Sequence, residues 1–97
     1  MPSRPFTKFD ALPDFAFMHE VGAPTEATML PVWSGKKAPP KVGDVIEISI
    51  NAIGPATVDA YATHDGYLGV MATPHNPPKW HSGESTLTFG TEIKDQR

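Results

Sequence analysis

Four histidines are the first residues to consider for chemistry, because a histidine can ligate a metal ion or act as a general base near neutral pH. They are His19, His64, His75 and His81, and the carboxylates that could accompany them are Glu20, Asp65 and Glu84. His75 and His81 have a His-x5-His spacing, but no third and fourth ligand follow at a recognisable interval. We therefore expect no metal site.

A nucleophile beside an oriented base is not indicated either. No serine lies in a Gly-x-Ser-x-Gly turn, and His64 and Asp65 are turn neighbours that form no preorganised pair. Gly35-Lys36-Lys37 lacks the rest of a phosphate-binding loop. The chain has no cysteine, which excludes thiolate nucleophiles and disulfides. We expect no catalytic residue and no cofactor, and hence a binding protein rather than an enzyme.

The aromatic side chains favour binding more strongly than the histidines favour catalysis. Strand parity or loop position places several of them outside the expected core, and Lys79-Trp80-His81 sets a cation beside an aromatic ring. Such side chains can stack on nucleic-acid bases or anchor a protein partner. They can equally be structural, with Trp80 closing the end of a barrel and Tyr61 covering Gly69. The candidate binding surface consists of Tyr61, Tyr67, His75, Lys79, Trp80 and His81.

The elements that must position these residues are strands, because residues 42–73 alternate between apolar and polar with a period of two. The first strand places three isoleucines on one face: Ile46, Ile48 and Ile50. Ile53-Gly54-Pro55 interrupts the pattern and predicts a hairpin tip, with Ile50 opposite Val58.

The next hairpin turns at His64-Asp65-Gly66. Its expected inward residues are Val58, Ala60 and Ala62 on one strand and Leu68, Val70 and Ala72 on the other. A two-residue loop would pair Thr63 with the core residue Leu68, whereas a three-residue loop pairs Thr63 with Tyr67. We therefore predict the three-residue loop, and a last strand after the proline-rich residues 74–78.

The first 41 residues show no sustained period and form a proline-rich segment. Residues 14–20 fit a short helix capped by Asp14 or a strand, and we favour the helix. Residues 28–33 look extended, and Pro31 predicts an edge position. Five aromatic side chains indicate that part of the segment packs over the open end of a barrel: Phe6, Phe9, Phe15, Phe17 and Trp33.

Two stretches carry a family resemblance. Val42-Gly43-Asp44-Val45-Ile46-Glu47-Ile48 resembles the Gly-Asp-x-Val start of the first strand of SH3-like small barrels, including the translation-factor and Tudor-like types. Tyr67-Leu68-Gly69-Val70 is similar to their third strand. Over residues 42–93 the resemblance implies a fold class and no function. This sequence lacks the acidic, aromatic-rich loop pattern of peptide-binding SH3 domains, and it lacks an aromatic cage for methyl-lysine. The resemblance therefore implies neither a proline-rich peptide nor methyl-lysine as a ligand.

The expected fold is mainly β: a small SH3-like antiparallel barrel over residues 42–97, with residues 1–41 packed on it and at most one short helix. Eleven prolines and 8 glycines in 97 residues argue against long helices. No stretch has the length or composition of a membrane span or a secretory signal, so we expect no membrane partner and a cytoplasmic location.

Three functions stay open. The first is a module for protein–protein interaction, which the net charge of −3 allows. The second is a nucleic-acid-binding barrel that uses Lys79, Trp80 and either Lys41 or Lys36-Lys37, whose binding would weaken steeply with salt. The third is a small oligomeric or metal-dependent enzyme with its active site between subunits. We favour the first, and the sequence leaves the partner and the oligomeric state open.

Overall fold

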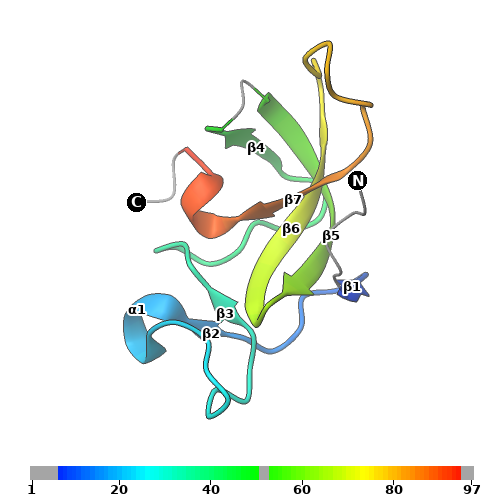
Figure 1. Cartoon of the computed structure of the whole chain (residues 1–97). Coiled ribbons are helices and arrows are strands. Elements are labelled where there is room, and N and C mark those ends of the chain that lie inside the picture. Colours follow the sequence, from blue (N-terminus) through cyan, green and yellow to red (C-terminus); the bar gives the residue numbers. More distant parts are fainter. Residues whose placement is uncertain (1–6, 51–52, 95–97) are drawn as a thin grey trace.

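Two long antiparallel strands, β5 (Gly54–His64) and β6 (Tyr67–Pro74), lie at the centre of the structure (Figure 1). The computed structural model describes residues 7–50 and 53–94. The other strands are β1 (Thr7–Phe9), β2 (Ala16–Phe17), β3 (Val32–Trp33), β4 (Val45–Ile48) and β7 (Thr86–Phe89). The helices are α1 (Met18–Val21) and the 3-10 helix η1 (Gly90–Glu92). Among the described residues, no helix is long and apolar enough to cross a membrane.

All the strands belong to one sheet. β1 and β4 both pair with β5, while β3 and β7 both pair with β6. β2 and β3 run parallel to each other, and β3 runs parallel to β6, so the sheet is mixed. The prediction of a mainly β protein with one short α-helix is confirmed. The sheet is not closed into a barrel within the described ranges, where one antiparallel bridge, Ile48 to Ile93, joins β4 to the residue after η1.

The first hairpin confirms the predicted faces of β4 but not its predicted register. Ile46 and Ile48 are buried and Val45 is exposed, as the alternation requires. Ile48 pairs with Gly54, so Ile50 does not lie opposite Val58 and is 37% exposed. The chain leaves the ladder after Ile48, where the N–H of Ser49 donates to the carbonyl of Glu92 instead.

The second hairpin has a two-residue turn, and the predicted three-residue loop is wrong. His64 pairs with Tyr67, and both turn residues have positive φ, 52° at Asp65 and 83° at Gly66. Positive φ at both central positions is the combination of a type I′ turn, whose twist matches that of the strands. Pairing Thr63 with Leu68 is allowed because β5 changes face partway along its length.

A β-bulge causes that change of face. The register with β6 shifts by one residue between Val58 and Ala60, and an extra residue in one strand reverses the alternation beyond it. Tyr61 therefore faces the main core together with Val58 and pairs with Val70, not with Gly69. The expected outward position of Tyr61 is wrong for this reason.

Both faces of the central strands are consequently covered. The main core contains Trp33, Ile46, Ile48, Ile53, Ala56, Val58, Tyr61, Leu68, Val70, Ala72 and Ile93, with Phe9, Phe15 and Phe17 packed against it. A smaller cluster contains Ala60, Ala62 and Met71, with Leu87 packed against it. Ala60 and Ala62 are thus buried as predicted, but in a different cluster from Val58.

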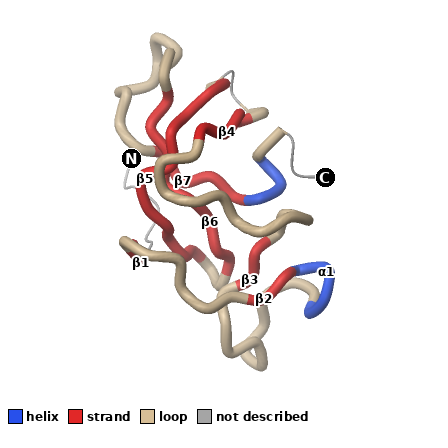
Figure 2. The backbone as a smooth tube through the Cα atoms, turned by 180° about the vertical axis from the view of Figure 1, so that it is seen from behind, coloured by secondary structure: helices blue, strands red, loops and turns tan. Residues whose placement is uncertain are grey.

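The N-terminal segment joins the same sheet (Figure 2). The helix expected over 14–20 is confined to α1, and Asp14 does not cap it: Phe17 is the N-cap residue and supplies no side-chain bond. The predicted edge position of residues 28–33 is also wrong. β3 lies between β6 and β2, which Pro31 permits because it precedes the strand and its carbonyl accepts from the N–H of Ala16.

Candidate functional site

The structure divides the candidate binding surface between two ends of the sheet. Tyr67 begins β6, whereas His75 to His81 follow the other end of this strand, in the loop between β6 and β7 (Figures 1 and 2). Tyr61 belongs to neither end, because its side chain is 4% exposed and its hydroxyl donates to the carbonyl of Pro40 at 2.8 Å. Burial, with a smaller contribution from the Asp44 charge, raises the pKa of Tyr61. The six residues do not form one surface.

The β6–β7 loop presents one large exposed aromatic ring. Trp80 is 64% exposed and packs edge-on against His81, with ring centroids 5.5 Å apart. Lys79 is exposed beside it. Both loop histidines have protein partners: His75 Nε2 lies 2.7 Å from the hydroxyl of Thr57, and His81 Nδ1 accepts from the N–H of Gly83. The loop can supply a stacking surface.

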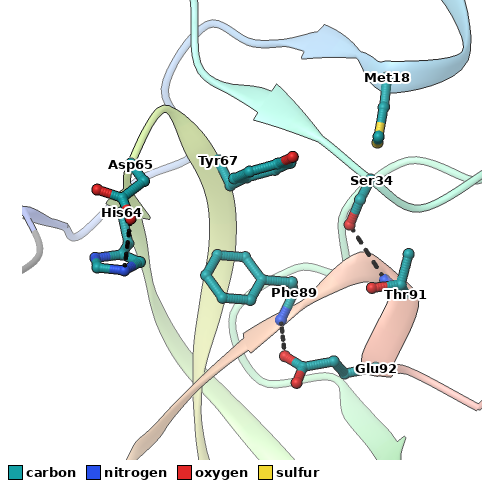
Figure 3. Close-up of a pocket in the computed structure, with 8 residues that line it drawn as sticks. All are labelled: Met18, Ser34, His64, Asp65, Tyr67, Phe89, Thr91 and Glu92. Atoms are coloured by element: carbon teal, nitrogen blue, oxygen red, sulfur yellow. Dashed lines mark hydrogen bonds and ion pairs between the residues drawn. The ribbon is translucent and has the colours of Figure 1, made fainter. Parts of the chain in front are cut away.

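A pocket of about 600 Å³ lies at the other end, around the β5–β6 turn (Figure 3). Its lining comes from four stretches of chain and consists of Met18, Ser34, His64, Asp65, Tyr67, Phe89, Thr91 and Glu92. The volume falls within the range of about 300–1,000 Å³ that is typical of ligand sites. Tyr67 is thus the one residue of the expected surface that lines it.

Three rings form one side of this pocket. The Tyr67 and Phe89 rings meet edge to face, with centroids 6.0 Å apart and planes at 70°, and His64 lies 6.4 Å from Phe89. The strand register brings them together: Phe89 pairs with Gly69, two residues along β6 from Tyr67 and therefore on the same face. All three residues are half-buried, so their rings are both supported and accessible.

Helix η1 forms the opposite side and is held in place by specific contacts. The Glu92 carboxylate accepts from the N–H of Phe89 at 2.8 Å, and the Ser34 hydroxyl accepts from the N–H of Thr91 at 3.2 Å (Figure 3). Gly90 is packed so closely that a Cβ there would lie 2.2 Å from the backbone nitrogen of Gly35. Two hydrogen bonds and one close backbone contact therefore fix η1 beside the pocket.

The charged groups of the pocket are acidic. Asp65 and Glu92 are carboxylates, and His64 Nε2 lies 3.2 Å from Asp65 Oδ2. The eight lining residues include neither a lysine nor an arginine. In the part of the chain that the structure describes, no three His, Asp or Glu side chains gather as they would around a metal ion.

A second polar cluster lies on the outer surface of the sheet. Asp59 accepts hydrogen bonds from the hydroxyls of Thr73, at 2.5 Å, and Ser85, at 2.7 Å. These bonds, chiefly that from Thr73, and the charge of Lys8 lower the pKa of Asp59, although slight desolvation opposes them. The cluster ties β5 to β6 and to the residue before β7.

Local sequence patterns do not predict most of the pocket. The sequence predicts a last strand after residues 74–78 and a helix over residues 14–20, but it assigns no binding role to Phe89, Met18, Ser34, Thr91 or Glu92. Phe89, Thr91 and Glu92 become neighbours of Tyr67 through the β6–β7 register. Met18 and Ser34 do so through the pairing of β2 with β3 and of β3 with β6, and no local pattern contains either arrangement. The Asp-Gly pair beside Tyr67, which marks the β5–β6 turn, was the one feature of the sequence that indicated the position of the pocket.

Comparison with known proteins gives no further assignment, since no family model, no curated protein and no solved structure matches this chain. The function must therefore be inferred from the site itself.

Proposed function

We propose that the protein is a small protein-binding module and that the pocket at the β5–β6 turn receives side chains of the partner. The observation that carries this proposal is the aromatic wall of Tyr67 and Phe89 beside η1, whose Gly90 packs closely against the backbone of Gly35. Preorganised aromatic pockets favour binding, since little entropy is lost on association and an aromatic contact buries much apolar area.

The test uses the full chain carrying an affinity tag, with lysate as the source of partners and nuclease treatment in one arm. A captured protein is identified and its affinity is measured for the parent, for Tyr67→Ala and for Trp80→Ala. We expect Tyr67→Ala to weaken binding by more than about tenfold, as truncation of an interface anchor does, and Trp80→Ala to bind like the parent. Circular dichroism establishes that both variants are folded.

Three results would contradict the proposal. They are the absence of any protein that survives nuclease treatment, an affinity that Tyr67→Ala leaves unchanged, and a loss of binding confined to Trp80→Ala. The last result would move the interface to the β6–β7 loop.

A nucleic-acid-binding function is the second candidate, and the exposed ring of Trp80 beside Lys79 is the observation that favours it. Bases stack on exposed aromatic rings, and a neighbouring cation adds attraction to phosphate. The net charge of −3 and the acidic pocket weigh against this reading. Binding to a single-stranded oligonucleotide that fell steeply with salt and required Trp80 would favour it over the first candidate.

We also propose an SH3-like arrangement for residues 45–93. Its support is the consecutive antiparallel pairing of β4, β5, β6 and β7, followed by the 3-10 helix η1 and the Ile48–Ile93 bridge back to β4. Such a return to the first strand is what would curl a meander towards a barrel. β1 then extends this arrangement by pairing with β5, and β3 does so by pairing with β6, with β2 beyond β3.

A further inference from the structure

We infer that the pocket binds an arginine side chain of the partner, an inference that rests on the proposed function and names the ligand. Its first ground is charge. Glu92 and Asp65 line the pocket, and neither a lysine nor an arginine is among its eight lining residues. His64 Nε2 already lies 3.2 Å from the exposed Asp65 carboxylate, so Glu92 is the principal carboxylate for a ligand. Glu92 is half-buried, so its charge is less screened by water than that of a fully exposed carboxylate. The lining is therefore complementary to a cation.

The second ground is the aromatic wall. Tyr67 and Phe89 have their rings at the pocket surface, and Figure 3 shows both beside the space that Ser34 and Met18 close on the far side. Because the rings are inclined at 70°, they present two differently oriented surfaces to one ligand. A cation over an aromatic face is attracted by the negative charge of that face, and a planar guanidinium can also stack on it.

The third ground is the number of acceptors, which favours arginine over lysine. Glu92 Oε1 accepts from the N–H of Phe89, but a carboxylate has about four lone-pair positions and can accept further bonds. The hydroxyls of Ser34 and Thr91 belong to the same side of the pocket as Glu92, and the Ser34 oxygen, which accepts from the N–H of Thr91, has a second lone pair. A guanidinium offers five donors in a rigid plane, whereas an ammonium offers three from a single point.

The experiment is a titration of the 15N-labelled full chain with three peptides, followed by the backbone amide resonances. The peptides are acetyl-Gly-Gly-Arg-Gly-Gly-amide and the same sequence with citrulline or lysine at the centre. We expect the arginine peptide to shift the resonances of Tyr67, Phe89 and Thr91 saturably. Citrulline keeps the shape and loses the charge, so its Kd should be at least about tenfold higher, and lysine should lie between the two.

Glu92→Gln supplies the matched protein variant, because glutamine keeps a carbonyl oxygen for the N–H of Phe89 and removes the charge. We expect it to weaken the arginine peptide by about three- to tenfold and to leave the citrulline peptide unchanged. The amide spectrum of the free variant shows whether the pocket is intact.

Equal binding of the arginine and citrulline peptides, or shifts confined to residues outside the pocket, would overturn the inference. If the arginine peptide does not bind while a captured partner protein still depends on Tyr67, the ligand is wrong and the binding-module proposal stands. If no partner protein depends on Tyr67 but the arginine peptide still saturates the pocket, the pocket binds arginine and the binding-module proposal is wrong.

Discussion

The exposed carboxylate of Asp59 on β5 forms hydrogen bonds with β6 and with the residue before β7. Its Oδ2 accepts from Thr73 and Ser85, and these bonds hold its pKa below the ordinary value of 3.8. A lowered folded-state pKa contributes stability that is fully present above the unfolded-state pKa. That stability is lost as the pH falls through the lower, folded-state pKa.

We therefore expect Asp59→Asn to be less stable than the parent at neutral pH and equally stable in acid well below pH 3.8. The deficit should be no more than about 1 kcal/mol, because the carboxylate is exposed and screened by water. Urea unfolding at the two pH values measures it, with Asp14→Asn as the control, since Asp14 is exposed and caps no helix. A deficit that did not change with pH would show that the hydrogen bonds to the charge are not its cause.

Asp65 carries the corresponding test for the shape of the β5–β6 turn. Its φ of 52° is unusual for a residue with a side chain, and its side chain is 80% exposed, so packing contributes little. We expect Asp65→Ile to cost about 1–2 kcal/mol because a branched Cβ clashes in the left-handed region. Asp65→Asn should be nearly neutral, since Asn-Gly suits this turn. Thermal unfolding measures both, and equal stability of the two variants would favour a turn with negative φ at this position.

At the level of the elements, the sequence predicts most strands but not how they pair. The alternation at Ile46 and Ile48 specifies the buried face of β4, and the Asp-Gly pair specifies where β5 turns into β6. The bulge after Val58 has no signature in the residue types, yet it reverses every face assignment up to the turn. The incorrect loop length and the misplaced Tyr61 both follow from this one residue, as correct parity reasoning was applied to a strand that changes face.

The pairing of the short N-terminal strands was beyond local reasoning for a different reason, although residues 28–33 were expected to be extended. β2 and β3 have two residues each, which are too few to show any period. β2 pairs in parallel with β3, and β3 pairs in parallel with β6, so each partner is distant in the sequence. Their stability comes from tertiary contact and not from strand propensity. Two of the eight lining residues depend on this docking, because Met18 and Ser34 follow β2 and β3 directly. The pocket therefore could not be predicted from the sequence, although the strands from β4 to β7 could.

Trp33 connects the N-terminal segment to the core of the central strands. Its ring is completely buried in the main core, and its Nε1–H donates to the carbonyl of Lys37 at 2.8 Å. β3 carries it into the sheet beside β6, where Trp33 pairs with Leu68. The N-terminal segment and the central strands thus share one core, and the pocket lies where they meet.

The two tryptophans provide a matched test of this arrangement. Trp33→Ala should cost about 3–5 kcal/mol, because it empties a large volume at the centre of the core, and that is much of the stability of a domain this size. Trp80→Ala should stay within about 0.5 kcal/mol of the parent, since Trp80 is 64% exposed. Denaturant unfolding measures both, and the fluorescence of Trp33 in the Trp80→Ala variant should be that of a buried indole. If the two variants were equally stable, the N-terminal segment would contribute nothing to the core, and a pocket that needs Met18 and Ser34 in place could not be preassembled.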